Sequence, residues 1–225
     1  MEKLKPGVIV FDMDGVLVDV TESYRAAIAD TVRQFSGHII SNADIQQYKN
    51  SGGWNNDWAL SQRIIADVSG REVPYEDVVE YFNAVFLGTR EEPGLIVRER
   101  WLPAPGLLER LVSRARLAIF TGRTRPELDP TLERFTPGFP WSAVLSDEDI
   151  TEKKPHPEGL LRIAAIHPGR PMLYVGDTID DARAAAAAGI AFVGIVHAAN
   201  PRHDEAVRLL EEHNAVAVLS DVNEL

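Results

Sequence analysis

The sequence contains no cysteine, and this absence excludes disulfide bonds, thiolate metal sites and a cysteine nucleophile. Basic residues are scarce: 23 lysines and arginines stand against 34 acidic residues, for a formal net charge of -11. Such a surface repels nucleic-acid backbones and anionic membranes, and no basic stripe with interleaved aromatic residues offsets it. No apolar run reaches 18 residues, and the N-terminal run is not typical of a signal peptide. We therefore expect a cytoplasmic protein with no nucleic-acid or membrane partner.

Short apolar runs rich in Val, Ile and Phe recur along the 225 residues and predict strands. These runs are 8–11, 117–121, 143–146, 172–176, 191–196 and 215–220. Continuous apolar strands are typical of a parallel sheet that is covered on both faces. Helix-like segments separate most of them, at 106–115, 126–135, 157–166, 180–188 and 203–213. The alternation predicts an α/β fold with a doubly wound parallel-sheet core.

One region lacks apolar strands and breaks this alternation. Between about Thr21 and Arg100 the sequence offers helix-like pieces only, so we expect a helical insert after the first strand. The predicted organisation is a catalytic core built from residues 1–18 and 101–225, with a helical cap domain at residues 19–100. Prolines and a glycine in WLPAPG mark the return of the chain to the core.

The first strand ends in two carboxylates, Asp12 and Asp14, and a later strand is followed by Asp177. The carboxyl ends of parallel strands form the usual ligand-binding edge of such a sheet. Three carboxylates gathered there would repel one another unless a cation lay between them, and hard oxygen ligands favour Mg²⁺. The sequence therefore predicts a magnesium site.

Groups that suit a phosphate occur at the same edge of the predicted sheet. Thr121 and Gly122 follow the second apolar run, and they offer a hydroxyl and a backbone amide. A lysine from KKPHP adds positive charge next to the phosphate. With Mg²⁺, these groups predict a phosphoryl-transfer site.

Four segments, DMDGVLVD, FTGR, KKPHP and GDTIDD, occur in this order along the chain. In their order and content they resemble the four motifs of the haloacid dehalogenase superfamily. The resemblance covers nearly the whole chain, and it implies a Rossmann-like core, a small helical cap and a Mg²⁺ cofactor. The closest subfamilies by resemblance are phosphatases and β-phosphoglucomutase-like enzymes.

The resemblance also implies roles for individual residues of the first two motifs. Asp12 corresponds to the nucleophile that forms an aspartyl-phosphate and also binds the metal. Asp14 corresponds to the general acid and base, and its main-chain carbonyl binds the metal. Thr121, with Gly122, corresponds to the group that binds the transferring phosphoryl group.

The last two motifs supply a cation and further carboxylates. Lys154 corresponds to the lysine that offsets charge on the phosphate and the nucleophile, with Lys153 as the alternative register. Asp177 corresponds to a metal ligand. Asp181 is expected to orient either a metal-bound water or Lys154 without binding the metal itself.

Asp14 favours one branch of the superfamily. Members that cleave carbon-halogen or carbon-phosphorus bonds generally lack an aspartate two positions after the nucleophile, because their leaving groups need no proton. The resemblance thus implies a Mg²⁺-dependent phosphatase that hydrolyses a small phosphorylated metabolite. The alternatives are a phosphomutase of the β-phosphoglucomutase type and a non-catalytic phosphate-binding module.

Substrate contacts beyond the phosphate are expected from the insert and from the residue after FTG. Residues 48–58 combine a glycine pair with amide and aromatic side chains, which suits recognition of a polar leaving group. Lys49 and Asn55 are the candidate contacts, whereas Trp58 is more typical of packing within the insert. Arg123 is a candidate substrate contact or a member of a structural ion pair.

Overall fold

The computed structural model describes residues 5–225, and the chain divides into two compact units. The core consists of Met1–Val18 and Trp101–Leu225, and the helical insert consists of Asp19–Arg100. Residues 1–4 of the predicted core segment 1–18 lie outside the described residues. The chain passes between the units at two short paired strands, β2 (Val18–Asp19) and β3 (Arg100–Trp101).

The core is built on a six-stranded sheet with the strand order β5-β4-β1-β6-β7-β8, and all neighbouring strands are parallel. Its strands are β1 (Val8–Phe11), β4 (Arg116–Phe120), β5 (Ala143–Leu145), β6 (Met172–Gly176), β7 (Ala191–Ile195) and β8 (Ala217–Leu219). Each of them lies within one of the six predicted apolar runs or differs from it by one residue at its start. The predicted doubly wound α/β core is therefore confirmed.

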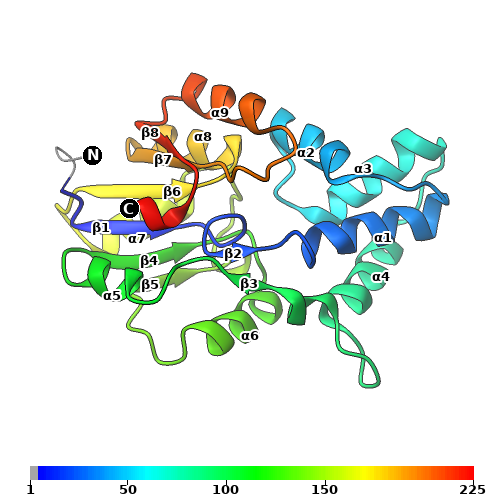
Figure 1. Ribbon diagram of the computed structural model, residues 1–225, viewed down its shortest axis with the longest axis horizontal. Coiled ribbons are helices and arrows are strands. Elements are labelled where there is room, and N and C mark those ends of the chain that lie inside the picture. The colour runs from blue at the N-terminus through cyan, green and yellow to red at the C-terminus, as the bar shows by residue number, and fades with distance from the viewer. Residues whose placement is uncertain (1–4) are drawn as a thin grey trace. The chain divides into compact units, whose positions relative to one another are not determined.

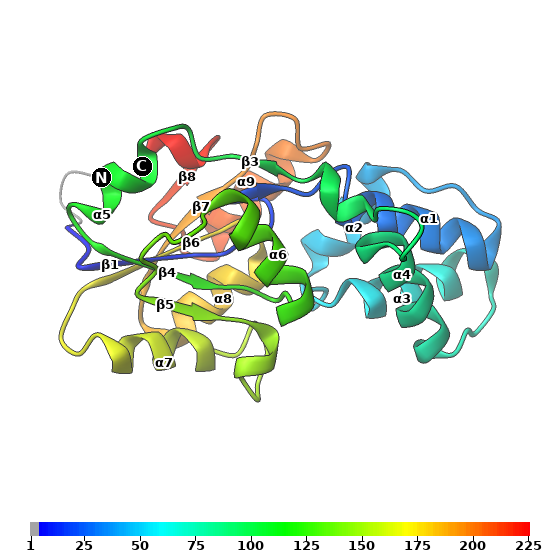
Figure 2. The same cartoon turned by 90° about the horizontal axis from the view of Figure 1, so that it is seen from below.

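Helices cover both faces of this sheet (Figures 1 and 2). Their bounds are α5 (Leu107–Val112), α6 (Arg125–Phe135), α7 (Glu158–Ile166), α8 (Ile179–Ala188) and α9 (His203–Glu212). Helices α7, α8 and α9 pack side by side on one face, and α5 and α6 lie on the other. Burial on both faces explains why the strand sequences are continuously apolar.

Strand β1 is the centre of the core. All four of its residues are buried, and it pairs with β4 on one side and with β6 on the other. Phe11, its last residue, lies beside Ile119 of β4 and Val175 of β6. Asp12 therefore leaves the middle of the sheet, between the ends of the two neighbouring strands.

The helical insert contains four α-helices, α1 (Tyr24–Ser36), α2 (Asn42–Ser51), α3 (Asp57–Ser69) and α4 (Tyr75–Leu87). Apolar side chains of α1, α3 and α4 form its own buried cluster. Trp58 packs against this cluster with its ring edge toward Phe82, and its indole N–H donates to Asn83. None of the helices within residues 5–225 has the length and apolar character needed to cross a bilayer.

Helix α2 places Lys49 near its carboxyl end, so residues 48–58 begin within a helix and continue into the loop before α3. A capping box at its start, in which Ser41 and Asp44 bond each other's backbone N–H groups, stabilises the first turn. The Ser-x-x-Asp spacing was a local signal for the start of this helix. The sequence of α2 contains few apolar residues, so no helical periodicity of apolar residues supported that signal.

Close packing between α7 and β4 requires a glycine in the first turn of α7. A Cβ atom added to Gly159 would lie 2.2 Å from Cε2 of Phe120, which is fully buried. The Phe120 ring also lies against the ammonium group of Lys154. The absence of a side chain at Gly159 therefore sets the position of a ring that contacts the functional lysine.

We predict that Gly159→Ala lowers the free energy of unfolding by about 1–2 kcal/mol, because overpacking of Phe120 outweighs the gain in helix propensity. Ala165→Ser adds one heavy atom on the exposed side of the same helix and should change stability by less than about 0.5 kcal/mol. Urea denaturation of both variants measures the difference. Equal stabilities would contradict the packing described here.

Candidate active site

The site lies at the carboxyl ends of the three central strands. Asp12 follows β1, Thr121 follows β4 and Asp177 follows β6. In the sheet, β1 stands between β4 and β6, so residues far apart in sequence meet at one edge. This is the position at which strand order reverses, where ligands bind in doubly wound sheets.

Lys154 lies in the middle of this group. Its ammonium nitrogen is 2.9 Å from Oδ1 of Asp12 and 2.8 Å from Oδ1 of Asp181. It also lies over the rings of Phe120 and Tyr174, at 4.8 and 5.4 Å from their centroids. The structure thus brings Lys154 to the site, whereas Lys153 pairs with Asp147 and is largely exposed.

Burial dominates the electrostatics of Asp12. Loss of solvent raises its pKa to about 7, and the nearby carboxylates of Asp181 and Asp14 act in the same direction, while Lys154 opposes them. Burial would lower the pKa of Lys154, but Asp12 and Asp181 hold it above its usual value. Burial would raise the pKa of Asp181, but Lys154 and hydrogen bonds from Thr178 and Tyr174 hold it below its usual value.

Asp181 is fully buried and accepts five hydrogen bonds. Oδ1 accepts from Lys154 and from the hydroxyl of Tyr174, at 2.8 and 2.7 Å. Oδ2 accepts from the backbone N–H groups of Asp177 and Thr178 and from the Thr178 hydroxyl. Since Thr178 is the N-cap of α8, one carboxylate both caps the helix and holds the lysine.

Asp14 pairs with Arg123 in the loop between β4 and α6. Nε and Nη2 of Arg123 both donate to Oδ1 of Asp14, at 2.8 and 2.5 Å. Nη1 donates to the hydroxyl of Thr131 on α6, at 2.8 Å. Arg123 therefore forms an ion pair with a site residue, and its predicted contact with substrate stays a prediction.

Thr121 and Gly122 form the turn that follows β4. The hydroxyl of Thr121 accepts a hydrogen bond from the backbone N–H of Arg123 at 3.2 Å. The backbone N–H of Thr121 donates to the backbone oxygen of Leu145. Thr121 is buried and Gly122 is exposed. Both follow β4, whose neighbour β1 ends directly before Asp12, and their binding of phosphate stays a prediction.

Asp177 lies against the turn that follows Asp14. A Cβ on Gly15 would lie 2.2 Å from Oδ2 of Asp177, and Gly15 has a φ of +70°. Only glycine allows this approach. Oxygen atoms of Asp12, Asp177 and Asp181 lie within 4.8 Å of one another and could together hold a metal ion. We consider Asp181 the weakest ligand of the three, because its oxygens are occupied by Lys154, Tyr174 and the start of α8.

The insert residues Lys49 and Asn55 lie in the other unit. Lys49 donates to Asp57 at 2.5 Å and to the backbone oxygen of Trp54 at 3.0 Å, so its ammonium group has partners within the insert. Asn55 lies in the loop between α2 and α3 and is partly buried. Their contact with substrate remains a prediction.

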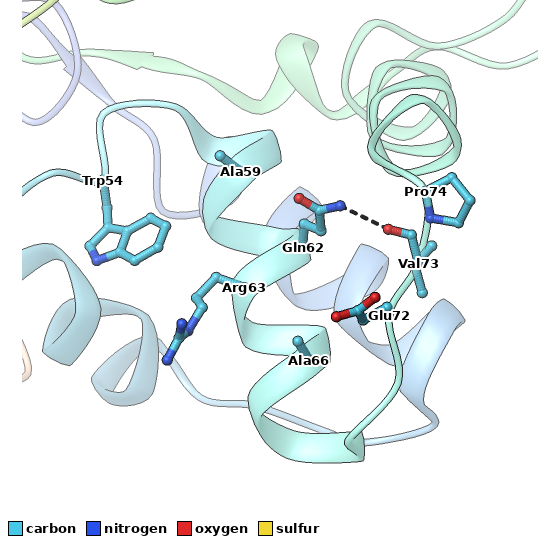
Figure 3. Close-up of a pocket in the computed structure, with 8 residues that line it drawn as sticks. All are labelled: Trp54, Ala59, Gln62, Arg63, Ala66, Glu72, Val73 and Pro74. Carbon is cyan, nitrogen blue, oxygen red and sulfur yellow. Dashed lines mark hydrogen bonds between the residues drawn. The ribbon is translucent and has the colours of Figure 1, made fainter.

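Helix α3 and the segment before α4 also line a pocket of about 700 Å³ in the insert (Figure 3). The residues that line it are Trp54, Ala59, Gln62, Arg63, Ala66, Glu72, Val73 and Pro74. Gln62 donates to the backbone oxygen of Val73 across its floor, and Arg63 is paired with Asp67. The pocket contains no cluster of carboxylates comparable to the one in the core.

Sequence reasoning missed Tyr174 as a member of the site. It belongs to the apolar run that forms β6, and it is fully buried. Burial and the neighbouring Asp181 and Asp12 raise its pKa well above the ordinary value, so its hydroxyl remains a donor. A tyrosine in an otherwise aliphatic strand was the only local signal, because a buried tyrosine hydroxyl usually needs a partner.

A buried nucleophile candidate, its lysine and a set of carboxylates at the end of a parallel sheet define a hydrolase site of the phosphoryl-transfer type. The family model of haloacid dehalogenase-like hydrolases matches residues 6–189, so the chain belongs to this family.

Several known proteins resemble this chain in sequence or in fold. Imidazoleglycerol-phosphate dehydratase of Phytophthora nicotianae is 34% identical over 201 residues, which are 84% of this chain but only 43% of that protein. Phosphoglycolate phosphatase of Salmonella typhimurium strain LT2 is 28% identical over 219 residues, covering 90% of this chain and 85% of that protein. CbbY from Rhodobacter sphaeroides, solved in complex with phosphate, has the same fold, with a TM-score of 0.71, 18% identity and coverage of 98% and 96%.

We predict that Lys154→Met lowers the free energy of unfolding by about 3–5 kcal/mol near neutral pH, because Asp12 and Asp181 stay buried without their cation. The matched control is Lys153→Met, which removes an exposed ion pair and should change stability by less than about 1 kcal/mol. Denaturant unfolding of the two variants measures the contrast. Equal stabilities would show that Lys154 does not hold the carboxylates together.

Proposed function

We propose that the protein is a Mg²⁺-dependent phosphatase that hydrolyses a small phosphorylated metabolite through an aspartyl-phosphate on Asp12. The observation that carries the proposal is the pair of contacts of the Lys154 ammonium group with Asp12 and Asp181. A cation beside the attacking carboxylate offsets the repulsion between that carboxylate and an incoming phosphate dianion.

In the first step, a carboxylate oxygen of Asp12 attacks phosphorus, and the bond from phosphorus to the ester oxygen breaks. Asp14 gives a proton to the departing oxygen, so that an alcohol leaves. Thr121 and Gly122 bind the non-bridging phosphate oxygens from the end of β4. The position of these residues at one edge of the sheet supports this step.

In the second step, water attacks phosphorus of the aspartyl-phosphate, and the bond to Asp12 breaks. Asp14 now takes the proton of that water, which returns both carboxyl groups to their starting forms and releases phosphate. Lys154 remains beside Asp12 throughout. The hydrogen bonds that Asp181 accepts from Lys154 and from the backbone N–H of Thr178 at the start of α8 support a fixed lysine.

The residues of the site fit a divalent metal ion. Asp12, Asp14, Asp177 and Asp181 bring four carboxylates against two cations, Lys154 and Arg123. The close contact of Asp177 with Gly15 supports a binding position at this turn. The carboxylates of Asp12 and Asp177 and the main-chain carbonyl of Asp14 would hold Mg²⁺, which would supply positive charge for the phosphate oxygens.

The substrate class rests on the relatives and on the insert. The phosphoglycolate phosphatase match covers most of both chains, which supports small phosphate esters of hydroxy acids and sugars. The dehydratase match covers less than half of that protein, so imidazole-bearing phosphate esters belong in the tested set only as candidates. Lys49, Asn55 and residues 48–58 stay proposed as substrate contacts.

Phosphate release from a panel of phosphorylated metabolites, with and without Mg²⁺, tests the proposal. The panel contains phosphoglycolate, hexose phosphates, nucleotides, histidinol phosphate and imidazole glycerol phosphate. We expect metal-dependent release that Asp12→Asn abolishes and Asp14→Asn lowers about 10²–10⁴-fold. Asp204→Asn, at a fully exposed carboxylate, should retain activity.

Absence of phosphate release from every ester would overturn the phosphatase proposal. If the protein converts a hexose 1-phosphate to its isomer without net release of phosphate, and only in the presence of the hexose bisphosphate, it is a phosphomutase and not a phosphatase. Mg²⁺ binding without any turnover would indicate a phosphate-binding module.

Mg²⁺ should raise the thermal unfolding midpoint more near pH 8 than near pH 5.5. Burial raises the pKa of Asp12 to about 7, so at the lower pH the cation must displace a proton from this ligand. At a Mg²⁺ concentration of 100 times its Kd, the gain in stability is about 2.7 kcal/mol. Asp177→Asn should reduce the shift and Asp204→Asn should not; the same shift in both variants would contradict the proposed ligands.

A further inference from the structure

Among residues 5–225, Arg123 has the largest fully buried side chain, yet its guanidinium group bonds a residue of the candidate active site. The exposed fraction of its side chain is 1%, whereas that of Asp14 is 33%. A guanidinium group with so little exposed surface has almost no area left for a substrate. Its bonding partners therefore indicate its role.

Two of its nitrogens act on a single oxygen of Asp14. Nε and Nη2 both donate to Oδ1, at 2.8 and 2.5 Å, and among the described residues the hydrogen bonds of this carboxylate all fall on Oδ1. Two donors converging on one oxygen restrict rotation of the carboxylate. They also occupy Oδ1 and leave Oδ2 to face other groups.

The other side of the guanidinium group is anchored on α6. Nη1 donates to the Thr131 hydroxyl at 2.8 Å and to the backbone oxygen of Glu127 at 3.3 Å. The Thr131 hydroxyl donates in turn to the same backbone oxygen, and all three side chains are buried. The backbone N–H of Arg123 bonds the hydroxyl of Thr121, so the arginine is fixed at both ends.

We propose that Arg123 is a positioning residue that holds Asp14 by Oδ1, so that Oδ2 exchanges the proton with the leaving group and then with water. The inference rests on the proposed function, and it replaces the predicted substrate contact of Arg123. When the ester bond breaks, its electron pair stays on the departing oxygen, which takes the proton from Oδ2. When water attacks the aspartyl-phosphate, its proton goes to Oδ2.

A series of leaving groups separates this role from phosphate binding. An alkyl ester needs a proton on its leaving oxygen, but acetyl phosphate releases acetate, which needs none. The ratio kcat/KM covers the steps up to formation of the aspartyl-phosphate, and it therefore excludes the later hydrolysis in which Asp14 also acts. We expect Arg123→Gln to lower kcat/KM for the best alkyl ester of the panel about 10–100-fold more than for acetyl phosphate.

Arg125→Gln is the matched control, because Arg125 lies two residues away and pairs with Asp149 instead of Asp14. It should leave the ratio of the two kcat/KM values unchanged. Thr131→Val removes the shorter of the two hydrogen bonds from Nη1 to α6 and leaves the one to the backbone oxygen of Glu127. It does not change the charge, and it should shift the ratio in the same direction as Arg123→Gln but by less. Arg123→Lys retains the charge but cannot donate two hydrogen bonds from a planar group to one oxygen. Its ratio of the two kcat/KM values should therefore lie between those of Arg123→Gln and the wild-type protein.

The outcomes are distinguishable. Equal losses for alkyl and acyl phosphates in Arg123→Gln would overturn the inference and support phosphate binding, while the phosphatase proposal stands. No turnover of any ester by the wild-type protein would overturn the proposed function itself. Circular dichroism and the unfolding midpoint report folding; if Arg123→Gln is unfolded, Thr131→Val and Arg123→Lys carry the same test, and an unchanged ratio in both overturns the inference.

Discussion

The active site depends on one buried cation shared by two buried carboxylates. The ammonium nitrogen of Lys154 lies within 3 Å of a carboxylate oxygen of Asp12 and of Asp181, and all three side chains are buried. Buried ion pairs are stable only when further hydrogen bonds satisfy their remaining atoms. Tyr174 and the first turn of α8 supply those bonds to Asp181. The sheet and the helix start thereby fix the lysine.

The site has a second ion pair, between Arg123 and Asp14, which is separate from the contacts of Lys154. Arg123 follows β4 and Asp14 follows β1, so their contact joins the carboxyl ends of two neighbouring strands. One pair sets the charge around Asp12, the proposed nucleophile, and the other restrains the carboxylate of Asp14, the proposed general acid and base. Each pair uses a cation from one loop and an aspartate from another, so both require the order of the central strands.

The strands and the motif residues could be predicted from the sequence, because each strand is a continuous apolar run and three of the four motifs lie at the end of one, whereas KKPHP precedes a helix-like segment. Within GDTIDD, Asp181 takes part in the capping box of α8 and also accepts a hydrogen bond from Lys154, as one of the two roles expected for it. The contacts of Tyr174 and Arg123 could not be predicted. The Arg123–Asp14 pair joins residues 109 apart, and it depends on strand register that no local pattern encodes.

The central claim is that Asp12 becomes covalently phosphorylated, and rapid acid quenching tests it most directly. Protein mixed with a phosphorus-labelled ester is quenched within one turnover, digested and mapped. The account predicts label that hydroxylamine removes, in the peptide that contains Asp12. Phosphate release without labelled protein at any time, or stable label on another residue, would contradict it.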